Sequence, residues 1–429
     1  MRRIPWLGLV ALWLVLVASL AAQSSFDYEL IDANGPSDPW GKCAGDLDGD
    51  GLPELLVQGN GGDLVAYYAP AFDPVTIDLG GSFSTDLEIV QVDGAAGPDL
   101  VVVAVGELRW YESPAWTAHP IDSRTLHDIE AADFDLDGDV DLVARNQGAS
   151  GDALHLYRQD TPTSWVHRAL SIPAGEGLAL ADVDRDGDLD IVVERRWIEN
   201  PRDLSESAVW NQHLYSTSWT WAATFVGTGD LNGDDRVDVV LAPSESSGGS
   251  YRIAWFEAPA DPEAPWSEHP IEPTVESVHH FVGVGDFDGD GDLDVAAAEM
   301  HQGANPDEVK LFWNAGGGTG WARQVLATTG SHSMRIADAD HDGDLDLFGA
   351  NWSGSHQAVE LWRNRAAIFR DGFESGDPSR WSEWVGWAGL DCHPPRRGRE
   401  GRTYAPLVSS CPSARQPLPL RGWSSTERR

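Results

Sequence analysis

An acidic nine-residue pattern recurs seven times and constrains the fold more than any other feature of the chain. Two of its clearest copies read Asp133-Phe-Asp-Leu-Asp-Gly-Asp-Val-Asp141 and Asp286-Phe-Asp-Gly-Asp-Gly-Asp-Leu-Asp294. The copies begin at residues 46, 91, 133, 182, 230, 286 and 338, so neighbouring copies lie 42 to 56 residues apart. One four-stranded propeller blade has a length of ~40–50 residues. The repeat therefore predicts a ring of seven blades.

Short apolar segments surround each copy and have the character of strands. An apolar approach such as Phe281–Val284 precedes the copy, and a β-branched run such as Ile191–Val193 follows it. An aromatic segment such as Trp110–Glu112 comes next, and then a segment such as His119–Ile121. These runs are too short for helices and are bounded by turn residues, which favours strands. Each repeat thus supplies four strands.

The count of segments predicts how the ring closes. The last aromatic segment, near Leu361, has no fourth segment after it, whereas Phe26–Ile31 at the expected mature N-terminus has that character. An N-terminal strand that completes the last blade removes the free sheet edges of the first and last blades. The predicted fold class is all-β. It is a seven-bladed β-propeller of four-stranded blades over residues 26–366, closed by the N-terminal strand and followed by a disordered C-terminal tail.

The spacing of the acids suits a hard cation. Ca²⁺ takes six to eight oxygen ligands at ~2.3–2.6 Å. Carboxylates at positions 1, 3, 5 and 9, with the carbonyl of position 7, can converge on one ion if Gly at position 6 allows a sharp turn. The predicted ligands are Asp46, Asp48, Asp50, Leu52 and Glu54; Asp133, Asp135, Asp137, Asp139 and Asp141; Asp182, Asp184, Asp186, Asp188 and Asp190; Asp230, Asn232, Asp234, Arg236 and Asp238; Asp286, Asp288, Asp290, Asp292 and Asp294; and Asp338, Asp340, Asp342, Asp344 and Asp346. We expect about six bound calcium ions.

Two alternatives compete with a calcium loop at each copy of the pattern. An EF-hand needs Glu at position 12 and a following helix, but position 12 holds residues such as Val57 and Ala144, and a strand-like run follows. A single acidic loop could be a solvated turn, whereas six in register at blade spacing favour metal. The copy from Gln91 to Asp99 has Ala95 and Ala96 in place of a ligand and the turn glycine, so we expect an empty turn there.

The acidic loops, the apolar strands after them and the Trp-Tyr-Glu-Asn-like segments resemble the FG-GAP and VCBS-type repeats of secreted bacterial proteins. They are also similar to the calcium-bearing blades of integrin α-subunit propellers. The resemblance covers about Phe26 to Arg365 and implies calcium in hairpin loops of the blades. It implies adhesion, carbohydrate or protein binding, or support of an attached catalytic domain. Asn232, Asp235 and Glu54 depart from the family pattern in ways that ligand chemistry tolerates.

Charge and the chain ends bear on partners and location. The formal charge is −40, which disfavours nucleic acid and anionic membranes as partners.

Residues 1–22 have the basic start, apolar run and small-residue end of a signal peptide, with an uncleaved anchor as the alternative. We expect a monomeric protein that is secreted, periplasmic or on the cell surface. Residues 367–429 are predicted to be a linker and disordered tail, in which Cys392 and Cys411 could pair, while Cys43 is expected to be buried.

No nucleophile elbow, phosphate loop or zinc motif occurs, so no catalytic residue is predicted. His127, His280 and His332 each lie six residues before a loop, on the strand nearest the channel. They could form a channel ring that binds a transition metal or acts in acid–base chemistry, or they could be packing residues. Three functions remain open. They are a scaffold for glycan or protein binding, a carbohydrate-active enzyme of the polysaccharide lyase or sugar dehydratase type, and a structural surface-layer component.

Overall fold

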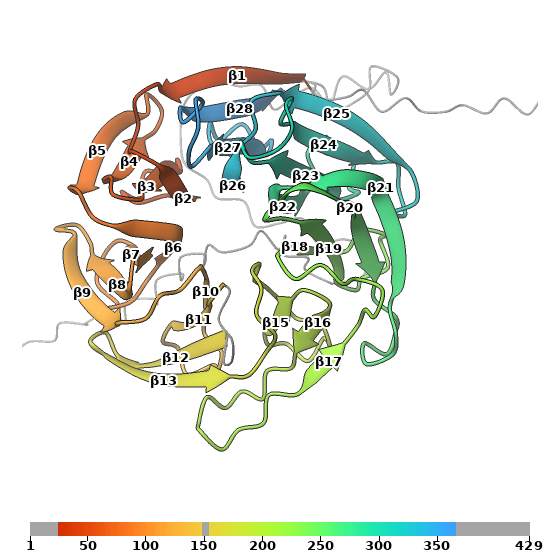
Figure 1. The fold of residues 1–429 in the computed structure, drawn as a ribbon. Helices are drawn as coiled ribbons and strands as arrows, with labels where there is room; N and C mark the ends of the chain where they lie inside the picture. Colours follow the sequence, from red (N-terminus) through yellow and green to blue (C-terminus); the bar gives the residue numbers. More distant parts are fainter. Residues whose placement is uncertain (1–24, 148–153, 366–429) are drawn as a thin grey trace, which may run out of the picture.

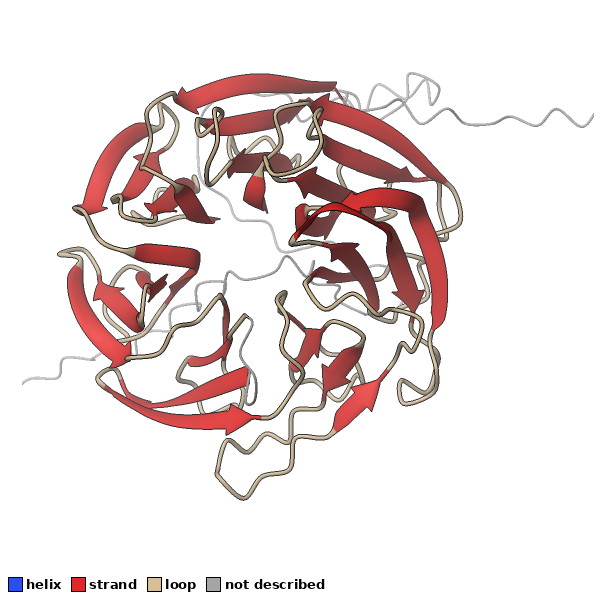
Figure 2. Ribbon diagram, viewed as in Figure 1, coloured by secondary structure: helices blue, strands red, loops and turns tan. Residues whose placement is uncertain are grey.

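The computed structural model describes residues 25–147 and 154–365, and every regular element in these ranges is a β-strand (Figure 2). The strands form seven four-stranded sheets, which stand side by side in a ring (Figure 1). Within every sheet, neighbouring strands are antiparallel and follow each other in chain order, apart from one strand that closes the ring. The prediction of an all-β, seven-bladed propeller is confirmed.

The blades are numbered along the chain, and the first strand of each blade lies nearest the central axis (Figure 1). Blade 1 contains β2 (Pro39–Gly45), β3 (Glu54–Gly59), β4 (Leu64–Tyr68) and β5 (Asp73–Asp78). Blade 2 contains β6 (Phe83–Val90), β7 (Asp99–Ala104), β8 (Glu107–Glu112) and β9 (Thr117–Asp122). Blade 3 contains β10 (Asp128–Ala132), β11 (Asp141–Arg145), β12 (Leu154–Thr161) and β13 (Ser164–Leu170). Blade 4 contains β14 (Ala179–Ala181), β15 (Asp190–Val193), β16 (Arg196–Ile198) and β17 (Gln212–Leu214). Blade 5 contains β18 (Thr224–Gly229), β19 (Asp238–Pro243), β20 (Ser246–Glu257) and β21 (Ser267–Ser277). Blade 6 contains β22 (His279–Gly285), β23 (Asp294–Glu299), β24 (Val309–Asn314) and β25 (Trp321–Ala327). Blade 7 contains β26 (His332–Ala337), β27 (Asp346–Ala350), β28 (Val359–Arg365) and β1 (Ser25–Asp32).

The alternating strand directions give the ring two different faces. Each acidic loop joins the first strand of its blade to the second, so all seven copies of the pattern lie on one face, here called the acidic face. The second strand ends on the other side, and the fourth strand also ends there before the next blade begins. We call that side the opposite face. The first strands run from the opposite face to the acidic face, so their first residues lie at the opposite-face end of the channel.

The ring is closed as predicted. β1 pairs with β28 in antiparallel register, with Phe26 opposite Asn364 and Glu29 opposite Leu361. Across the same seam, the buried Lys42 ammonium donates to carbonyls of blade 1 and to the carbonyls of His332 and Ala350 in blade 7. Backbone pairing at the rim and a buried cation near the axis thus both hold the first and last blades together.

The hydrophobic core is divided among the interfaces between neighbouring blades. Seven buried clusters occur, and each contains side chains from two adjacent sheets. The cluster at the seam brings Leu55 and Val57 of blade 1 against Phe348 and Leu361 of blade 7, all at most 1% exposed. Each interface packs well only when both of its blades keep their shape. The acidic loops help to fix that shape, so they also affect how the core packs.

The histidines of the outer strands have structural contacts, as their periodic placement predicts. His119, His213 and His269 stack on the tryptophan of the neighbouring strand, with ring centroids 4.1 to 4.5 Å apart. In each case the ring Nε2 also lies 2.9 to 3.0 Å from a glutamate carboxylate. His167 instead contacts His155 and Tyr157.

Several predictions concern residues outside the described ranges. The signal peptide (1–22), the linker and tail (367–429), and the pairing of Cys392 with Cys411 fall there and stay predictions. Cys43 lies within the described part and is buried, as expected. The described ranges hold no helix with the length and apolarity that a membrane crossing requires.

Candidate metal sites

The six complete acidic loops share one backbone conformation. Each has eight residues between its two strands, and position 9 is the first residue of the second strand. The predicted turn glycine at position 6 has a positive φ in five loops, and Asp235 takes the same conformation in the fifth loop. Position 4 also has a positive φ in all six, although Leu136, Arg185 and His341 are among its occupants. Position 4 was not predictable from the sequence, because only three of its six residues are glycine.

Hydrogen bonds within each loop turn the carboxylates inward. The position-1 carboxylate accepts the backbone N–H of position 6 in all six loops, for example Gly291 to Asp286 at 3.1 Å. The position-5 carboxylate accepts the N–H of position 7 in the same six loops. The bonds from position 5 are Asx turns, and together with the longer bonds from position 1 they curl the short chain around its own side-chain oxygens.

The curl brings together carboxylates that the sequence placed at alternate positions. Ligand atoms lie within 4.8 Å of one another in groups that include Asp46, Asp48 and Asp50; Asp133, Asp135 and Asp141; Asp182, Asp184 and Asp190; and Asp286, Asp288 and Asp290. Two unit charges at such a distance repel by roughly 1 kcal/mol in water and roughly 3 kcal/mol at an effective dielectric constant of ~20. A cation among them would remove this repulsion, so these clusters could hold metal ions.

Carboxylate oxygens without hydrogen-bond partners point to the same conclusion. Within the described residues, Asp135 Oδ1, Asp182 Oδ1, Asp340 Oδ1 and Glu54 Oε1 are buried and accept no hydrogen bond. All four belong to loop positions predicted as ligands. A buried carboxylate oxygen without a partner is costly unless it is paired with a cation. The donor set, which consists of oxygen atoms, fits Ca²⁺ better than a softer metal.

Arginines contact three of the six loops. Arg202 pairs with Asp186 and Asp188 in the fourth loop, and Arg363 and Arg365 both reach Asp340 in the seventh. In the fifth loop, Arg236 at position 7 pairs with Asp234. Across the described chain, no arginine forms an ion pair with the acids of the first, third or sixth loop. These three loops consequently depend most on an external cation for charge balance.

The acid at position 9 has a structural role that the sequence did not reveal. In the sixth loop, Asp294 accepts the N–H of Phe287 at position 2 with one oxygen and the N–H of Asn314 in the third strand with the other. The same two kinds of bond occur at Asp99, Asp141, Asp190, Asp238 and Asp346. Position 9 therefore joins the loop to the third strand of its own blade. Its role as a metal ligand stays a prediction, because each oxygen keeps a further lone pair.

Burial and crowding disfavour the ionised form of these acids. Burial raises the pKa of Asp294 to about 8 against the opposing effect of its backbone hydrogen bonds, and that of Asp141 to about 7. Burial and the neighbouring Asp290 raise the pKa of Asp288 to about 6. Without a cation, these buried acids keep part of their protons near neutral pH. A bound divalent ion would displace those protons.

The second loop contains an amide where the others have acids. Gln91 at position 1 donates from Nε2 to the carbonyls of Ala95 and Gly97, at 2.8 and 2.7 Å, and accepts the N–H of Gly94 with its oxygen. Gly97 occupies position 7, whose carbonyl is a predicted ligand in the complete loops. The amide thus satisfies carbonyls within the loop without any ion, which agrees with the expected empty turn.

Amide side chains at the end of the third strand, or just after it, connect neighbouring blades. Asn314 of blade 6 donates to the carbonyl of Leu231 in the loop of blade 5, at 2.8 Å. Asn200, Asn364 and Gln159 make the equivalent bond to the preceding blade's loop. The asparagine of the repeated aromatic segment was visible in the sequence, but its partner lies 66 to 83 residues away in the asparagine cases. The loops of blades 2, 3, 5 and 6 are therefore held by their own blade and by the next one.

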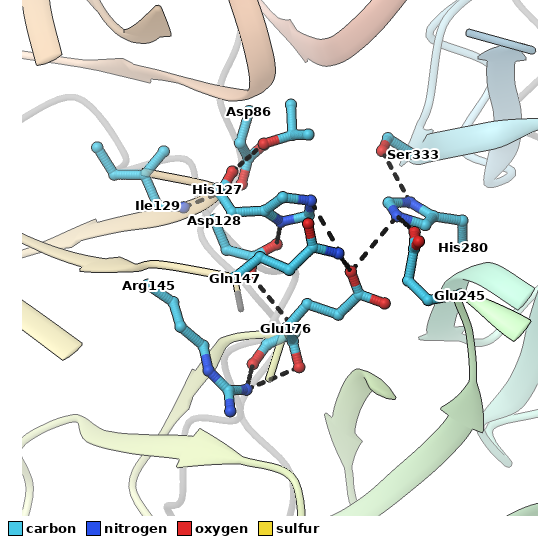
Figure 3. Close-up of polar contacts among 12 residues, drawn as sticks. Asp86, His127, Asp128, Ile129, Arg145, Gln147, Glu176, Glu245, His280 and Ser333 are labelled. Carbon is cyan, nitrogen blue, oxygen red and sulfur yellow. Dashed lines mark hydrogen bonds and ion pairs between the residues drawn. The ribbon is translucent and has the colours of Figure 1, made fainter. Parts of the chain in front are cut away.

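The three histidines predicted to line the channel do come together on the opposite face. The rings of His280 and His332 stack with centroids 3.8 Å apart, and His127 lies 5.9 Å from His280. Burial lowers the pKa of His280 and, more strongly, that of His332. Burial also opposes protonation of His127, but Asp128 outweighs it and the pKa of His127 is raised to about 9. Glu176, which the sequence analysis did not single out, lies between His127 and His280 (Figure 3).

These features define the class of protein as a β-propeller with acidic hairpin loops on one face. The sequence profile of the FG-GAP-like repeat matches residues 133–193, 230–297 and 286–349. Each matched segment runs from one acidic loop to the strand after the next loop. The chain is an FG-GAP-repeat β-propeller, as the residues of its loops had indicated.

Comparisons with other known proteins support the fold alone. No curated protein matches the chain. The solved structure of BBS1N in complex with ARL6DN is similar with a TM-score of 0.51 and 11% identity, covering 80% of this chain and 99% of that one. Rhamnogalacturonan lyase YesW matches with a TM-score of 0.46 and 13% identity, covering 78% and 75%. A variant of AofleA from Arthrobotrys oligospora gives 0.40 and 12%, covering 71% and 90%.

Proposed function

We propose that the chain is an exported, calcium-stabilised scaffold that binds a glycan or protein ligand on its opposite face. The observation that carries the calcium part is the set of buried, unpartnered carboxylate oxygens in loops whose other acids already curl around a common point. Calcium is the cation best suited to an all-oxygen donor set with flexible geometry. The apolar N-terminal segment supports export.

The difference between the loops on the two faces supports a binding role. The acidic face carries the predicted metal loops, so the loops of the opposite face are available to a ligand. Loops of blades 6 and 7 form a pocket of about 180 Å³ there, lined by His301, Asp307, Thr328, Thr329, Gly354 and His356 among others. Imidazole, carboxylate and hydroxyl groups around a small concave site are suited to the hydroxyl groups of a sugar.

Removal of metal tests the calcium part. Each site that is saturated a hundredfold above its dissociation constant adds ~2.7 kcal/mol to stability. Stripping the loops should lower the melting temperature by roughly 10 °C or more, and calcium in excess of the chelator should restore it. If melting is the same with and without chelator, calcium has no structural role.

A glycan-binding screen tests the ligand part separately. The calcium-loaded chain should bind at least one glycan or protein class saturably, and His356→Ala should weaken that binding about tenfold through loss of one polar contact. Thr117→Ala, on the exposed outer strand β9, is the matched control and should bind normally. An absence of any saturable ligand besides calcium would contradict the scaffold and favour a purely structural component.

A carbohydrate-active enzyme of the lyase or dehydratase type is the second candidate. The observation that favours it is the buried group of His127, His280 and Glu176 at the opposite-face end of the channel (Figure 3). Turnover of a polyanionic or keto-sugar that His280→Ala abolishes would establish this activity. Glycan binding without turnover would exclude it for the sugars tested.

A further inference from the structure

Three side chains from the beginnings of blades 3, 4 and 6 converge at the opposite-face end of the channel (Figure 3). His127 directly precedes β10, Glu176 lies in the connection from β13 to β14, and His280 is the second residue of β22. His127 Nε2 and His280 Nε2 lie 3.8 and 3.7 Å from the same oxygen, Glu176 Oε2. These distances are too long for hydrogen bonds. The three ligand atoms lie within 4.8 Å of one another, so they surround a common point without closing on it.

The spacing suits a small metal ion. Bonds of ~2.0–2.2 Å from zinc to nitrogen and oxygen place two ligands of a tetrahedron roughly 3.3–3.6 Å apart. The observed separations of 3.7 and 3.8 Å therefore need to contract only slightly around an ion. The predicted ligand atoms of the acidic loops are carboxylate and carbonyl oxygens, whereas this site has two imidazoles. Imidazole nitrogen favours zinc and related transition metals over calcium.

Hydrogen bonds to the other ring nitrogens orient both histidines. His127 Nδ1 lies 3.1 Å from Asp128 Oδ1, so a proton on Nδ1 leaves the lone pair of Nε2 directed to Glu176. His280 Nδ1 lies 3.4 Å from the Ser333 hydroxyl, and its Nε2 faces Glu176 and Glu245. A carboxylate on the far nitrogen, as Asp128 supplies for His127, is the arrangement that fixes the tautomer of a metal-ligating histidine.

Glu176 has an oxygen that nothing in the described chain satisfies. Its side chain is fully buried, and Oε2 accepts a hydrogen bond from Gln147 at 2.5 Å. Oε1 is buried and accepts none. A buried carboxylate with an unpartnered oxygen beside two imidazoles is expensive unless a cation completes it. Glu245, at 3.2 Å from His280 Nε2 and 38% exposed, is placed at the outer side of the cluster.

We propose that His127, Glu176 and His280 bind one divalent transition metal of the zinc class, with Glu245 as a fourth ligand from the outer side. This site is separate from the calcium loops in position and in donor chemistry. It does not depend on the scaffold function proposed above. Because the ligands come from blades 3, 5 and 6 and from the connection into blade 4, a bound ion would link blades across the channel rather than within one sheet.

Cobalt(II) is the probe that separates this site from the loops. The full chain is first stripped of metal, then saturated with calcium, and then titrated with Co²⁺. We expect one equivalent to bind with the intense visible bands of a four-coordinate nitrogen–oxygen site, and one equivalent of Zn²⁺ to remove them. Six-coordinate oxygen loops would give only weak bands. A wild-type chain that shows no saturable visible band overturns the proposal.

Variants assign the ligands. His280→Gln and Glu176→Gln should each weaken Co²⁺ binding by about 100-fold or more, and Glu245→Gln by about tenfold. His119→Gln, which changes a stacked histidine of blade 2, is the matched control and should leave the titration unchanged. If the buried variants fail to fold, the Co²⁺ spectrum of the wild-type chain and the Co²⁺ titration of Glu245→Gln still test the proposal. Unaltered titrations of every folded channel variant would refute the assignment.

Discussion

The second and sixth loops connect equivalent strands of blades 2 and 6, with the same number of residues and the same position-9 bonds, yet their interiors differ. In the sixth loop, Asp286, Asp288 and Asp290 converge without an arginine partner. In the second, the Gln91 amide donates to two loop carbonyls, which are thereby satisfied within the loop. Both keep the position-9 acid with its backbone bonds.

The comparison separates two functions of the repeat. Position 9 shapes the hairpin, because it is retained with its hydrogen bonds in the loop that has lost the acids at positions 1 and 5. Positions 1 and 5 serve the cation, because both lose their acids where an amide takes over, whereas position 3 keeps its acid as Asp93. A blade can thus lose its ion and keep its fold when the loop supplies its own hydrogen-bond donors.

Asp99→Ala should have the largest effect of a single substitution in the second loop. It leaves the N–H groups of Val92 and Ser113 without their acceptor, and each unsatisfied group costs ~1–3 kcal/mol. We expect a loss of about 2–4 kcal/mol, measured by denaturant unfolding, that is equal with and without calcium. A loss seen only in calcium would mean that Asp99 is a ligand after all.

The pH dependence of the stripped protein should show the strain in the acidic loops. Burial raises the folded-state pKa of Asp141, Asp190, Asp238 and Asp346 to about 7, above the ordinary value of about 4. Between about pH 4 and pH 7 the folded state therefore holds protons that the unfolded state releases, so stability falls as pH rises through that range and levels off above it. We expect melting about 5 °C lower at pH 8 than at pH 5.5, with a larger gain from calcium at pH 8. A stripped protein that is more stable at pH 8 would show that these acids are not strained.

Asp288→Asn in the sixth loop should have effects of opposite sign in the two metal states. With calcium it should remove or weaken one site and cost up to ~2.7 kcal/mol. Without metal it removes one charge from a crowded cluster, so stability should stay the same or rise. Asp93→Asn, at the equivalent position of the second loop, is the control and should show no calcium-dependent change. Equal losses of stability with and without calcium would contradict the role of Asp288 as a calcium ligand.

Gln91→Leu should have the smallest effect. The substitution removes the two bonds from the amide to Ala95 and Gly97 and the acceptor for Gly94. A loss of about 1–2 kcal/mol is expected, independent of calcium. Calorimetric melting in both metal states measures it. A calcium-dependent loss would indicate that the second loop also binds an ion.

The sequence predicted what repeats along the chain. Seven blades, the closing strand and the placement of each loop between two strands follow from the period of Asp-rich segments and from the count of strand-like runs. The structural role of position 9 was not predictable, because acid chemistry alone does not distinguish a metal ligand from an acceptor of backbone N–H groups. The partner of Asn314 was not predictable either, because Leu231 approaches it only when neighbouring blades pack.

The channel cluster was even less predictable from the sequence than the contacts of the loops. His127 and His280 were visible because they share an offset from their loops. Glu176 and Glu245 lie in connections that do not repeat, so no period marks them. Only the closed ring places these four side chains together. Sequence patterns therefore predict the parts that repeat, while sites built across blades require the structure.

The calcium content of the purified chain tests the central claim most directly. After equilibration at millimolar calcium and removal of free ion, elemental analysis should find about six ions per chain, one for each complete acidic loop. Asp288→Asn should reduce that number by one, and Asp93→Asn should leave it unchanged. A wild-type chain that retains essentially no calcium would contradict the account.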